Sequence, residues 1–546
     1  MIFRYLGQRE LQDTLGEKLL KSLEKLLPPL RPNDFDETDI YRKEMLLRIL
    51  VSFSPSQRLK DKDFMRTLLN SVPEDVLGTI CEKTGVGISS VTFDERVTAL
   101  VSRGWRDTDF CKNFIEAAGL PSSFLPTPKV SLPNEELCEK SAWPYKRLKD
   151  YQTRVYEKSY EHLEANLARC VIQMPTGSGK TRTAMEIISD FINQSPPNAA
   201  VIWLAHSEEL CEQAIACFRD IWAHIGERDV RLCRCFGSSS SLPFDKGGTL
   251  FVVGGFQKLH SMLKRDDSPF NIMRDRTILL VIDEAHKVLA PTYKAVTKAL
   301  IGHLTRVVGL TATPGRSASD IDQNQELAGF FFNKIIGIEV PDYISVFSFL
   351  RKREIMSRVV RDPLITDLKY ELTSAQVKYL NQRFDFPPNF LGELGRDQIR
   401  NFEIVKRILK ECSGGGQILF FGCSVEHSQF ICAVLSFFEV KAAHIDGGTP
   451  KSERSYIIES FRKSNLQVLC NYGVLSTGFD APKTDVVFIS RPTSSLVLYS
   501  QMIGRGLRGP AIGGTARCKL IDVIDNIAGL PEEAIIYDYF EEYWVK

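Results

Sequence analysis

The sequence predicts an α/β protein in which two tandem parallel-sheet domains follow an all-helical N-terminal domain. Three observations support this prediction: leucines recur at helical spacing near the N-terminus, short apolar runs alternate with helical stretches from about residue 145 onward, and these runs fall into two groups. A chain of 546 residues is also too long for one ordinary hydrophobic core, so several domains are expected.

Helical periodicity dominates the N-terminal region. Leucines recur at helical spacing from Leu11 to Leu27, and the stretches IYRKEMLLRILVSF and DFMRTLLNSV continue the pattern. The segment GLPSSFLPTPKVSLP then carries four prolines, which disfavour both helix and central strand. We therefore predict a helical accessory domain over residues 1–140.

Two groups of apolar strands follow this region. The first group contains AVIWLAH, TLFVVGG, TILLVIDE and TRVVGLTAT, and the second contains QILFFG, LQVLCNYG and DVVFIS. Nearly continuous apolar strands separated by helices are typical of parallel sheets that are covered on both faces. We predict a first sheet domain over residues 141–335, a connecting segment over 336–400 and a second sheet domain over 401–546.

The composition is that of a soluble globular protein, with 43% hydrophobic residues, 25% charged residues and a formal net charge of +1. A charge so close to zero gives no global basic field, so any nucleic-acid partner must be held by local contacts. The N-terminus MIFRYLGQRELQ has charges where a signal peptide needs an apolar core, and no stretch reaches the roughly 18 apolar residues of a membrane span. We therefore expect a cytoplasmic location and no membrane partner.

Thirteen cysteines are scattered along the chain, and Cys233 and Cys235 form the one close pair. No second pair follows at the spacing of zinc ligands. We interpret the cysteines as reduced thiols of an intracellular protein, and a zinc site is the minority interpretation.

The stretch VIQMPTGSGKTRTAME predicts a strand, a tight loop and a helix. Its loop runs from Thr176 to Gly179, where glycines let backbone N–H groups converge on phosphate oxygens next to a helix N-terminus. Lys180 would then reach the β- and γ-phosphates, and the Thr181 hydroxyl would bind Mg²⁺. Because Met174 stands where the strict pattern has glycine, an ordinary turn before a helix remains the alternative for this stretch alone.

A second motif, TILLVIDEAH, lies about 100 residues further on. Its apolar strand ends at Asp283 and Glu284, which we expect beside the loop. Asp283 is placed to hold Mg²⁺ through its water shell, and Glu284 to orient or deprotonate the attacking water. Two carboxylates at a strand end can be ordinary surface charge, but their position after the loop favours the catalytic interpretation.

A third motif, QMIGRGLRGP, places Gln501, Arg505 and Arg508 at spacings i, i+4 and i+7. On a helix these side chains would share one face. That face would present guanidinium groups to a γ-phosphate bound by the first domain, where they would stabilise the charge of the transition state. A solvated helix face is the alternative.

These motifs resemble those of the superfamily-two helicases and translocases, which share two RecA-like domains with ATP between them. The resemblance covers about residues 145–540. LKDYQ resembles the Q motif, in which Gln152 would contact adenine, and LAHSEELCEQ, VVGGFQKL and LTATP resemble motif Ia, the following nucleic-acid segment and motif III. FFGCSVEH, VLSTGFDAP and QMIGRGLRGP resemble motifs IV, V and VI.

The strings LSTGFDAPKTDVVFISRPTSSLVLYSQMIGRGLR and YISVFSFLRKREI resemble the DEAH-type branch with RadD-type, XPB-like and type III restriction helicases. Members of that branch act mostly on DNA. Two features differ: the cysteine-rich zinc region that RadD-type proteins carry has no counterpart after Asp522, and Ser207 stands where motif Ia usually has an arginine.

The resemblance implies an ATP-dependent nucleic-acid helicase or translocase that uses ATP and Mg²⁺ to move or remodel strands, DNA more than RNA. The alternative is an ATP-gated motor or sensor subunit of a repair, restriction or antiviral complex, with a protein partner on the N-terminal domain. A P-loop kinase is disfavoured, because it has no use for arginines on a second domain.

The motifs assign three sets of residues. Those implied to bind the nucleotide are Gln152, Thr176, Gly177, Ser178, Gly179, Lys180, Thr181, Gly478, Asp480 and Gln501. Those implied in catalysis are Lys180, Asp283, Glu284, Arg505 and Arg508, with Thr181 and Asp283 as metal ligands. Those implied to contact nucleic acid are His206, Gly255, Phe256, Cys423 and Thr477, although Phe256 is equally interpretable as a core residue. The basic string Arg351-Lys352-Arg353 either follows a phosphate backbone or is a solvated face.

Overall fold

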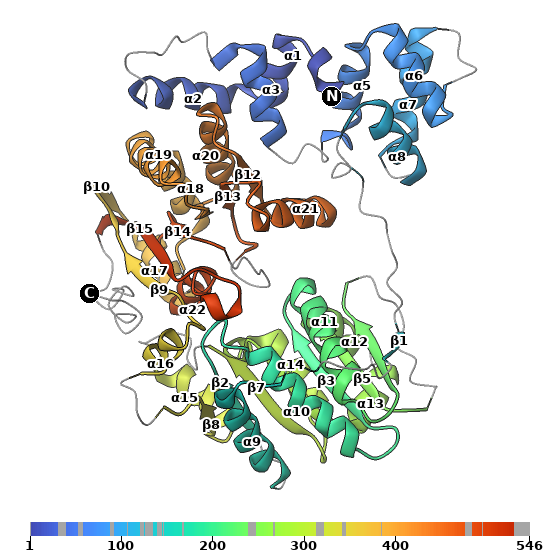
Figure 1. Ribbon diagram of the computed structural model, residues 1–546, viewed down its shortest axis with the longest axis vertical. Coiled ribbons are helices and arrows are strands. Elements are labelled where there is room, and N and C mark those ends of the chain that lie inside the picture. The colour runs from blue at the N-terminus through green and yellow to red at the C-terminus, as the bar shows by residue number, and fades with distance from the viewer. Residues whose placement is uncertain are drawn as a thin grey trace.

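The computed structural model places most of the chain. The described residues are 2–30, 40–52, 58–87, 92–105, 108–120, 125, 135–138, 145, 147–165, 169–237, 247–265, 268–312, 321–340, 345–383, 385–475, 483–493 and 495–528. They form a helical region followed by two mostly parallel sheets with helices packed on them (Figure 1). The predicted fold class, two tandem parallel-sheet domains after an all-helical region, is confirmed.

The helical region has two groups of short helices. They are α1 (Gln8–Leu15), α2 (Glu17–Leu30) and α3 (Lys43–Ser52), then α5 (Lys62–Asn70), α6 (Glu74–Thr84), α7 (Phe93–Arg103) and α8 (Thr108–Ala117), after a 3-10 turn at Ile2–Tyr5. Capping residues that directly precede the helices define several helix N-termini. Asp61 accepts hydrogen bonds from the N–H groups of Asp63 and Phe64 at the start of α5, and Thr92 and Glu95 form a capping box at the start of α7.

The first sheet has eight strands. Their order is β1 (Glu135–Cys138), β4 (Val230–Cys235), β5 (Leu250–Gly255), β3 (Ala200–Ala205), β6 (Thr277–Asp283), β7 (Arg306–Thr311), β2 (Arg169–Gln173) and β8 (Ile335–Gly337). All neighbours are parallel except β1 and β4. The helices on one face are α9 (Asp150–Glu164), α10 (Lys180–Gln194) and α11 (Glu208–Ile225), and those on the other are α12 (Phe256–Lys264), α13 (Ser268–Arg276), α14 (Pro291–Leu300) and α15 (Ile321–Phe330).

The second sheet is parallel throughout. Its order is β10 (Leu364–Glu371), β15 (Arg517–Ala528), β14 (Val486–Ile489), β11 (Ile418–Phe421), β13 (Val468–Asn471) and β12 (Ala442–Ile445), with β9 (Arg358–Arg361) also paired to β15. The helices are α16 (Val346–Lys352), α17 (Ser374–Arg383), α18 (Pro388–Arg396), α19 (Gln398–Ser413), α20 (Val425–Phe437), α21 (Lys451–Arg462) and α22 (Leu496–Ile503). Along β11, Ile418 and Phe420 face the core on one side and Leu419 and Phe421 the core on the other.

Three strands lie outside the sheet domains that the sequence predicts. β1 falls in the predicted helical domain and extends the first sheet, and β9 and β10 fall in the predicted connecting segment and extend the second. All three are peripheral strands with a neighbour from a distant part of the chain. Such strands lack the continuous apolar run of a central strand, so periodicity does not reveal them.

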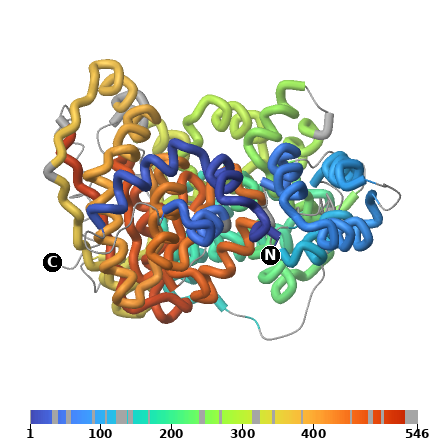
Figure 2. Tube along the Cα trace, turned by 90° about the horizontal axis from the view of Figure 1, so that it is seen from above, coloured from blue at the N-terminus to red at the C-terminus, as the bar shows by residue number. Residues whose placement is uncertain are grey.

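The helical region packs on the second sheet domain, although the first sheet domain follows it in sequence. α3 contacts α20 and β12, and α2 contacts α19 and α20. Viewed from above, the first helices lie across the second domain (Figure 2). Arg48 Nη1 lies 2.9 Å from Glu439 Oε1, and the Cys432 Sγ atom lies 3.8 Å from the Ser52 carbonyl oxygen. Apolar side chains of both regions belong to one buried cluster.

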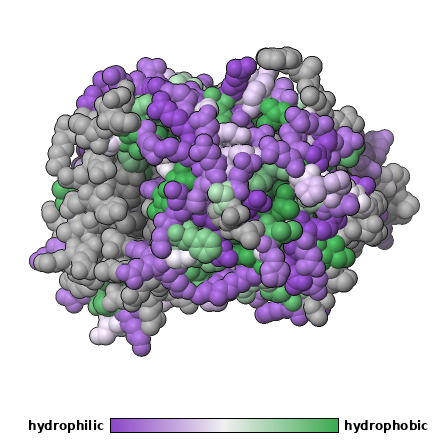
Figure 3. Space-filling view, turned by 90° about the horizontal axis from the view of Figure 1, so that it is seen from below, coloured by the Kyte–Doolittle hydropathy of each residue, from purple (hydrophilic) through white to green (hydrophobic). Residues whose placement is uncertain are grey.

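The end of the molecule opposite the helical region has a mainly polar surface. Seen from below, polar side chains dominate the coloured surface, with apolar residues scattered among them (Figure 3). Among the helices that the structure describes, none is both long enough and apolar enough to span a bilayer.

Candidate nucleotide site

The predicted phosphate loop connects β2 to α10. Gly177 and Gly179 have φ angles of 83° and 93°, in the left-handed region that glycine adopts without strain. An added Cβ at position 179 would also lie 1.9 Å from Gln152 Nε2, so the Gln152 side chain would have to leave its place against the loop. The loop therefore turns tightly into the N-terminus of the 15-residue helix α10, as an anion-binding loop requires.

Gln152 and Tyr151 at the start of α9 hold this loop. Gln152 Nε2 and the Tyr151 hydroxyl both donate to the Ser178 carbonyl oxygen, at 3.0 and 2.8 Å. Gln152 Oε1 accepts from the Lys149 N–H at 2.8 Å. One N–H and one lone pair of the Gln152 amide remain for an adenine edge, and that role stays a prediction. The sequence did not identify Tyr151, although it directly precedes Gln152 in the LKDYQ string.

Lys180 begins α10, and its Nζ lies 3.4 Å from the Met174 carbonyl oxygen. Met174, the residue that departs from the strict loop pattern, is fully buried under the loop. Thr181 is half-buried beside it. Lys180 is close enough to lower the pKa values of both Asp283 and Glu284 by its charge, so the loop and the acidic pair form one site.

Asp283 ends β6 and is buried. Its Oδ1 accepts from the Glu284 N–H at 3.0 Å. Burial, followed by the charge of Glu284, raises the pKa of Asp283 to about 7. Burial also opposes the ionisation of Glu284, but the charges of His286, Lys180 and Lys287 outweigh it and lower the pKa of Glu284. The two adjacent carboxyls are therefore pushed apart in acidity, with Glu284 the stronger acid.

His286, Lys287 and Thr311 surround the acidic pair. His286 Nδ1 lies 3.4 Å from Glu284 Oε2 and 3.3 Å from Thr311 Oγ1, so the first threonine of LTATP contacts the DEAH segment. Burial lowers the pKa of His286 to about 4, which keeps the ring neutral at pH 7. Sequence reasoning assigned His286 and Lys287 no role; their position directly after Asp283-Glu284 was the available signal.

His206, predicted to contact nucleic acid, lies between β3 and α11. Its Nε2 is 3.1 Å from Lys287 Nζ, so the start of the predicted motif Ia touches the segment after Glu284. Burial, followed by the Lys287 charge, lowers the pKa of His206 to about 4. Ser207 caps α11 by accepting from the Leu210 N–H at 3.3 Å.

The second domain reaches this site through Gln501 and the residues that follow it. Gln501 Nε2 donates to Glu284 Oε1 at 3.2 Å across the boundary between the two sheet domains, which we call the seam. A Cβ on Gly504 would lie 2.7 Å from Thr176 Cγ2, and a Cβ on Gly177 would lie 3.9 Å from Arg508 Cγ. The structure thus brings the phosphate loop, the acidic pair and the third motif together at one seam.

The expected helical face through Gln501, Arg505 and Arg508 is wrong. α22 ends at Ile503, with Gly504 as its C-cap, and turns carry the chain through Arg505. Arg508 then forms an isolated bridge with Met356, and its carbonyl oxygen accepts from Ser357 Oγ at 2.6 Å. The glycines at 504 and 506 allow this exit, because an added Cβ at either position would clash with neighbours.

Two residues predicted to contact nucleic acid are buried instead. Phe256 is 2% exposed and stacks on Tyr293 with a centroid distance of 4.0 Å, so its ring is part of the core and cannot stack on a base. Cys423 is fully buried, with Sγ 3.2 Å from the Ser490 carbonyl oxygen. Gly255 ends β5, where a Cβ would lie 3.1 Å from Phe236. Thr477, Gly478 and Asp480 lie outside the described residues.

The basic string is only partly available to a phosphate backbone. Arg353 pairs with Asp150 and packs over the Phe349 ring at 4.5 Å. Arg361, further along, forms a two-pronged pair with Asp522 at 2.8 and 3.2 Å. Arg353 thus ties the segment before β9 to α9, and Arg361 ties β9 to β15.

No group of three or more histidine, cysteine, aspartate or glutamate side chains in the described part of the chain has the arrangement of a metal site. Cys233 and Cys235 are buried strand residues, and Cys235 Sγ lies 3.6 Å from Met262 Sδ.

Both sheet domains match known protein families. Residues 145–316 match the family described as type III restriction enzyme, res subunit, and residues 400–509 match the helicase conserved C-terminal domain. The helical region before residue 145 lies outside both matches.

Three curated relatives align over most of the chain. A 51.5 kDa protein of a Lactococcus phage is 25% identical over 69% of this chain and 71% of its own length. The irc3 protein of Schizosaccharomyces pombe, whose name describes a mitochondrial ATP-dependent helicase, is 27% identical over 71% of this chain. The IRC3 protein of Saccharomyces cerevisiae, named for ATP-dependent helicase activity, is 26% identical over 69%.

The aligned regions span 61% and 51% of the two yeast proteins, so the chain corresponds to little more than half of each. The two family matches fall on the two sheet domains that carry the phosphate loop and the arginine motif. Residues 145–316 and 400–509 thus match the two domains of a superfamily-two helicase, in the branch that contains the type III restriction enzymes.

Proposed function

We propose that this chain is an ATP-dependent helicase or translocase that acts on DNA. One observation carries the proposal: Gln501 of the second domain contacts Glu284 of the first, directly beside the phosphate loop. A nucleoside triphosphate bound at this seam would touch both domains, so its hydrolysis would change their spacing. The names of the yeast relatives describe ATP-dependent helicases, which supports the same activity here.

The residues present fit ATP and Mg²⁺. The backbone of Thr176–Gly179 and the N-terminus of α10 supply N–H donors for phosphates, and Lys180 supplies a positive charge. Thr181 and Asp283 are the proposed metal ligands. Because burial raises the pKa of Asp283, its protonated form is favoured in the empty site, and a divalent cation beside it would displace that proton. Mg²⁺ supplies charge neutralisation for the phosphates when it is bound.

Glu284 is the proposed base for the attacking water. Its lowered pKa keeps it ionised at pH 7, so it can accept a hydrogen bond from water. The neutral His286 ring lies beside Oε2 and Gln501 binds Oε1, so both oxygens have a fixed neighbour. Water would have to share or replace the Gln501 contact, and this links the chemistry to the position of the second domain. Arg505 and Arg508 are the proposed stabilisers of transition-state charge.

The proposed path from the nucleotide to nucleic acid runs through Lys287. This residue follows the acidic pair and contacts His206 at the end of β3, where α11 begins. A change at Glu284 can reach the start of α11 through these two side chains. We propose that the surface beside α11 and the start of α20 holds the strand, by backbone N–H groups and hydroxyls that position phosphates without reading bases.

The experiment that tests the function measures ATPase rates with single-stranded DNA, duplex DNA, forked DNA and RNA across a salt series. We expect DNA to stimulate turnover, with an effect that weakens as salt rises. A strand-displacement assay then separates unwinding from translocation alone. If no nucleic acid changes the rate at any salt concentration, the proposal fails.

The second candidate is a motor or sensor subunit that needs a protein partner. Two observations favour it: the first domain matches a family described as a restriction subunit, and the helical region lies outside both matched families. In that case the purified chain would hydrolyse ATP poorly with every nucleic acid and gain activity only with the partner. The mitochondrial relative leaves the expected cytoplasmic location a prediction.

A further inference from the structure

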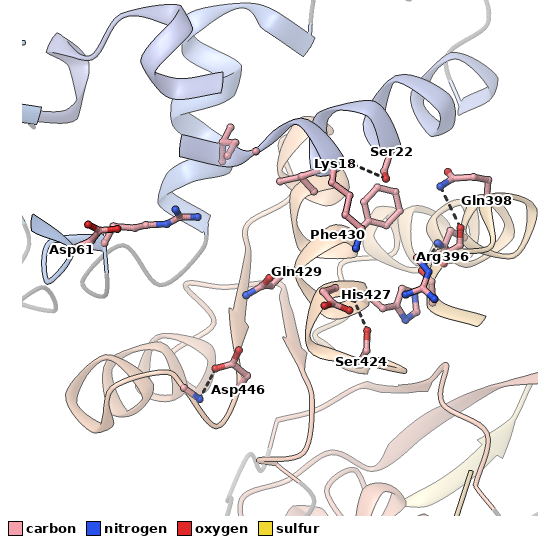
Figure 4. Close-up of a pocket in the computed structure, with 18 residues that line it drawn as sticks. Lys18, Ser22, Asp61, Arg396, Gln398, Ser424, His427, Gln429, Phe430 and Asp446 are labelled. Atoms are coloured by element: carbon pink, nitrogen blue, oxygen red, sulfur yellow. Dashed lines mark hydrogen bonds between the residues drawn. The ribbon is translucent and has the colours of Figure 1, made fainter. Parts of the chain in front are cut away.

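A cavity of about 520 Å³ lies between the helical region and the second sheet domain (Figure 4). Helices α1 and α2 and the segment before α5 form one side. The end of α18, the starts of α19 and α20 and the residues after β12 form the other. Its volume falls within the range of roughly 300–1,000 Å³ that is typical of small-molecule sites. No residue of the phosphate loop lines it.

The cavity lies at a position in the sheet where ligands commonly bind. Its wall includes Ser424 after β11 and Asp446 after β12, at the carboxyl ends of these parallel strands. The chain leaves β11 toward β12 at one edge and later returns to β14 on the other side of β11. Ligands of open α/β sheets bind outside the carboxyl ends at such a reversal.

Polar atoms on the floor of the cavity lack partners among the described residues. They are His427 Nε2, Asn401 Oδ1 and Gln398 Oε1. His427 is 2% exposed and Asn401 fully buried, and buried polar atoms of native proteins are nearly always satisfied by protein, water or ligand. The other ends of these side chains are used: His427 Nδ1 accepts from the Cys423 N–H at 3.1 Å, and Asn401 Nδ2 donates to the Gly395 carbonyl oxygen at 2.9 Å.

These contacts define the hydrogen-bonding character of the floor. Burial lowers the pKa of His427 to about 3, so its ring is neutral. Because Nδ1 is an acceptor, the ring proton is on Nε2, which is a donor. Asn401 Oδ1 and Gln398 Oε1 are acceptors. The floor therefore offers one donor and two acceptors, and the edge of a nucleobase carries groups of both kinds.

Three cations come from three different elements around the cavity. They are Lys18 on α2, Arg58 before α5 and Arg396 at the end of α18. None of the three forms an ion pair with another described residue. In Figure 4, Lys18 extends from the helical region toward Phe430 and His427 of α20.

The acidic groups of the same cavity are largely engaged elsewhere. Asp61 caps α5. Asp446 accepts from the N–H groups of Gly448 and Thr449, at 2.8 and 2.9 Å, and from His444. Its bond from His444 lowers the pKa of Asp446 to about 2. Glu426 is exposed on the first turn of α20. Lys18 and Arg396 are thus available to an anion, whereas the charge of Asp61 already acts on Arg58.

We propose that this cavity takes one nucleotide, with its base against His427 and Asn401 and its phosphate facing Lys18 and Arg58. The apolar walls of Leu19 and Phe430 suit the face of a base. The nucleotide is either one unstacked unit of the bound strand or a free mononucleotide. The strand source rests on the proposed function and deepens it, because the helical region would then complete the strand path.

Photo-crosslinking tests the strand source directly. The full chain, with a non-hydrolysable ATP analogue in the phosphate-loop site, is irradiated with thymidine-rich single-stranded DNA that carries 5-iododeoxyuridine at one position. We expect crosslinked peptides that contain His427 and Phe430. Crosslinks confined to other peptides, together with unchanged DNA binding by Lys18→Glu, rule out the strand as the source of the nucleotide.

Matched charge reversals on α2 test the cations. Lys18→Glu should weaken binding of the same DNA about tenfold, because it places a negative charge in the cavity. Lys21→Glu is the control: Lys21 lies one turn further on α2, pairs with the exposed Glu17 and does not line the cavity, so its affinity should change less than twofold. Gln398→Ala, a half-exposed position that tolerates truncation, should weaken binding without a charge change. Equal effects of Lys18→Glu and Lys21→Glu count against the site.

Free thymidine monophosphate, titrated with the phosphate-loop site filled, distinguishes the two sources. The cavity is a site for a free nucleotide if three results agree. Thymidine monophosphate binds the wild-type protein, Lys18→Glu abolishes that binding, and DNA does not crosslink to the cavity. If wild-type protein neither binds DNA nor responds to it in turnover, the proposed function fails, and the monophosphate titration still decides the cavity. Absence of monophosphate binding and of cavity crosslinks overturns the site.

Discussion

The second sheet domain has two seams of opposite character. Toward the helical region it is apolar: side chains of α2, α3, α19 and α20 belong to one buried cluster, which includes Leu23, Leu26, Ile49, Leu50, Ile404, Ile408, Phe430 and Val434. Toward the first domain the described contacts are mainly polar, namely Gln501 with Glu284, Arg454 with Glu209 and Arg353 with Asp150. Apolar contact also occurs there: Phe349 packs on Tyr151 with centroids 6.0 Å apart, and one buried cluster includes side chains of both sheet domains.

This difference indicates which seam opens. Fully burying one apolar side chain stabilises a contact by about 1.5–3 kcal/mol, whereas an exposed ion pair contributes about 0–1 kcal/mol. The helical region should therefore move with the second domain as one body while the nucleotide seam opens and closes. Its place in the sequence, before the first domain, gives no hint of this attachment.

The largest effect should come from removing the chemistry at the polar seam. Lys180→Ala and Glu284→Gln should each lower the ATPase kcat by about a thousandfold or more, because one removes the phosphate cation and the other the proposed base. Steady-state hydrolysis with DNA measures this, and circular dichroism checks the fold. Near-normal hydrolysis by either variant would remove that residue from the site.

The next effect is on the apolar seam. Cys432→Asp should destabilise the protein by about 3–5 kcal/mol, because it buries an unpaired carboxylate beside the end of α3. Chemical denaturation measures the loss. Hydrogen exchange should rise most in α2 and α3, which would separate from α20. Cys432→Ser is the matched control, since its hydroxyl can still donate to the Ser52 carbonyl oxygen. Equal exchange changes throughout the chain would contradict a local seam.

A smaller effect is expected from Arg505→Ala. Loss of a guanidinium that acts only in the transition state should lower kcat about a hundredfold and leave ATP affinity within about twofold. ATP binding and single-turnover hydrolysis separate these quantities. Arg462→Ala, at an exposed arginine of α21 that pairs with Glu459, serves as the control. A variant that loses DNA affinity with unchanged kcat would show that Arg505 has a different role.

Local patterns were sufficient to locate half of the candidate nucleotide site. The loop at Thr176–Gly179 and the pair Asp283-Glu284 each follow a buried strand, and a strand followed by a glycine-rich turn is recognisable from a few neighbouring residues. The carboxyl ends of parallel strands lie at the same edge of a sheet, so the loop and the acidic pair could also be expected to lie close together. The same logic predicted the two sheets and the helical start.

Contacts between distant parts of the chain could not be predicted in this way. Gln501 meets Glu284 across 217 positions, and only the packing of two domains decides which amide points at which carboxylate. Phe256 sits in a polar, glycine-rich string, yet it is buried because Tyr293 from α14 covers it. α22 ends at Ile503, before Arg505, because Gly504 caps it. The i, i+4, i+7 spacing of Gln501, Arg505 and Arg508 takes no account of this glycine.

The smallest effect should come from removing one polar contact between the two sheet domains that takes no part in the chemistry. Arg454 Nη1 lies 2.8 Å from Glu209 Oε1 across the seam, and its Nη2 donates to the carbonyl oxygens of Asp446 and Thr449, each at 3.2 Å. Glu209→Ala removes the pair and leaves those loop bonds. It should weaken ATP affinity without DNA by no more than about fivefold, with less effect at high salt.

Arg454→Ala separates the pair from the loop. If the pair alone holds the seam, this variant should match Glu209→Ala and the double variant should add nothing, as in a double-mutant cycle of two contacting residues. A larger loss in Arg454→Ala would place the effect in the loop at Asp446, which also borders the cavity under the helical region. Additive losses would mean that the two side chains act independently, and the polar seam would then be held by other contacts.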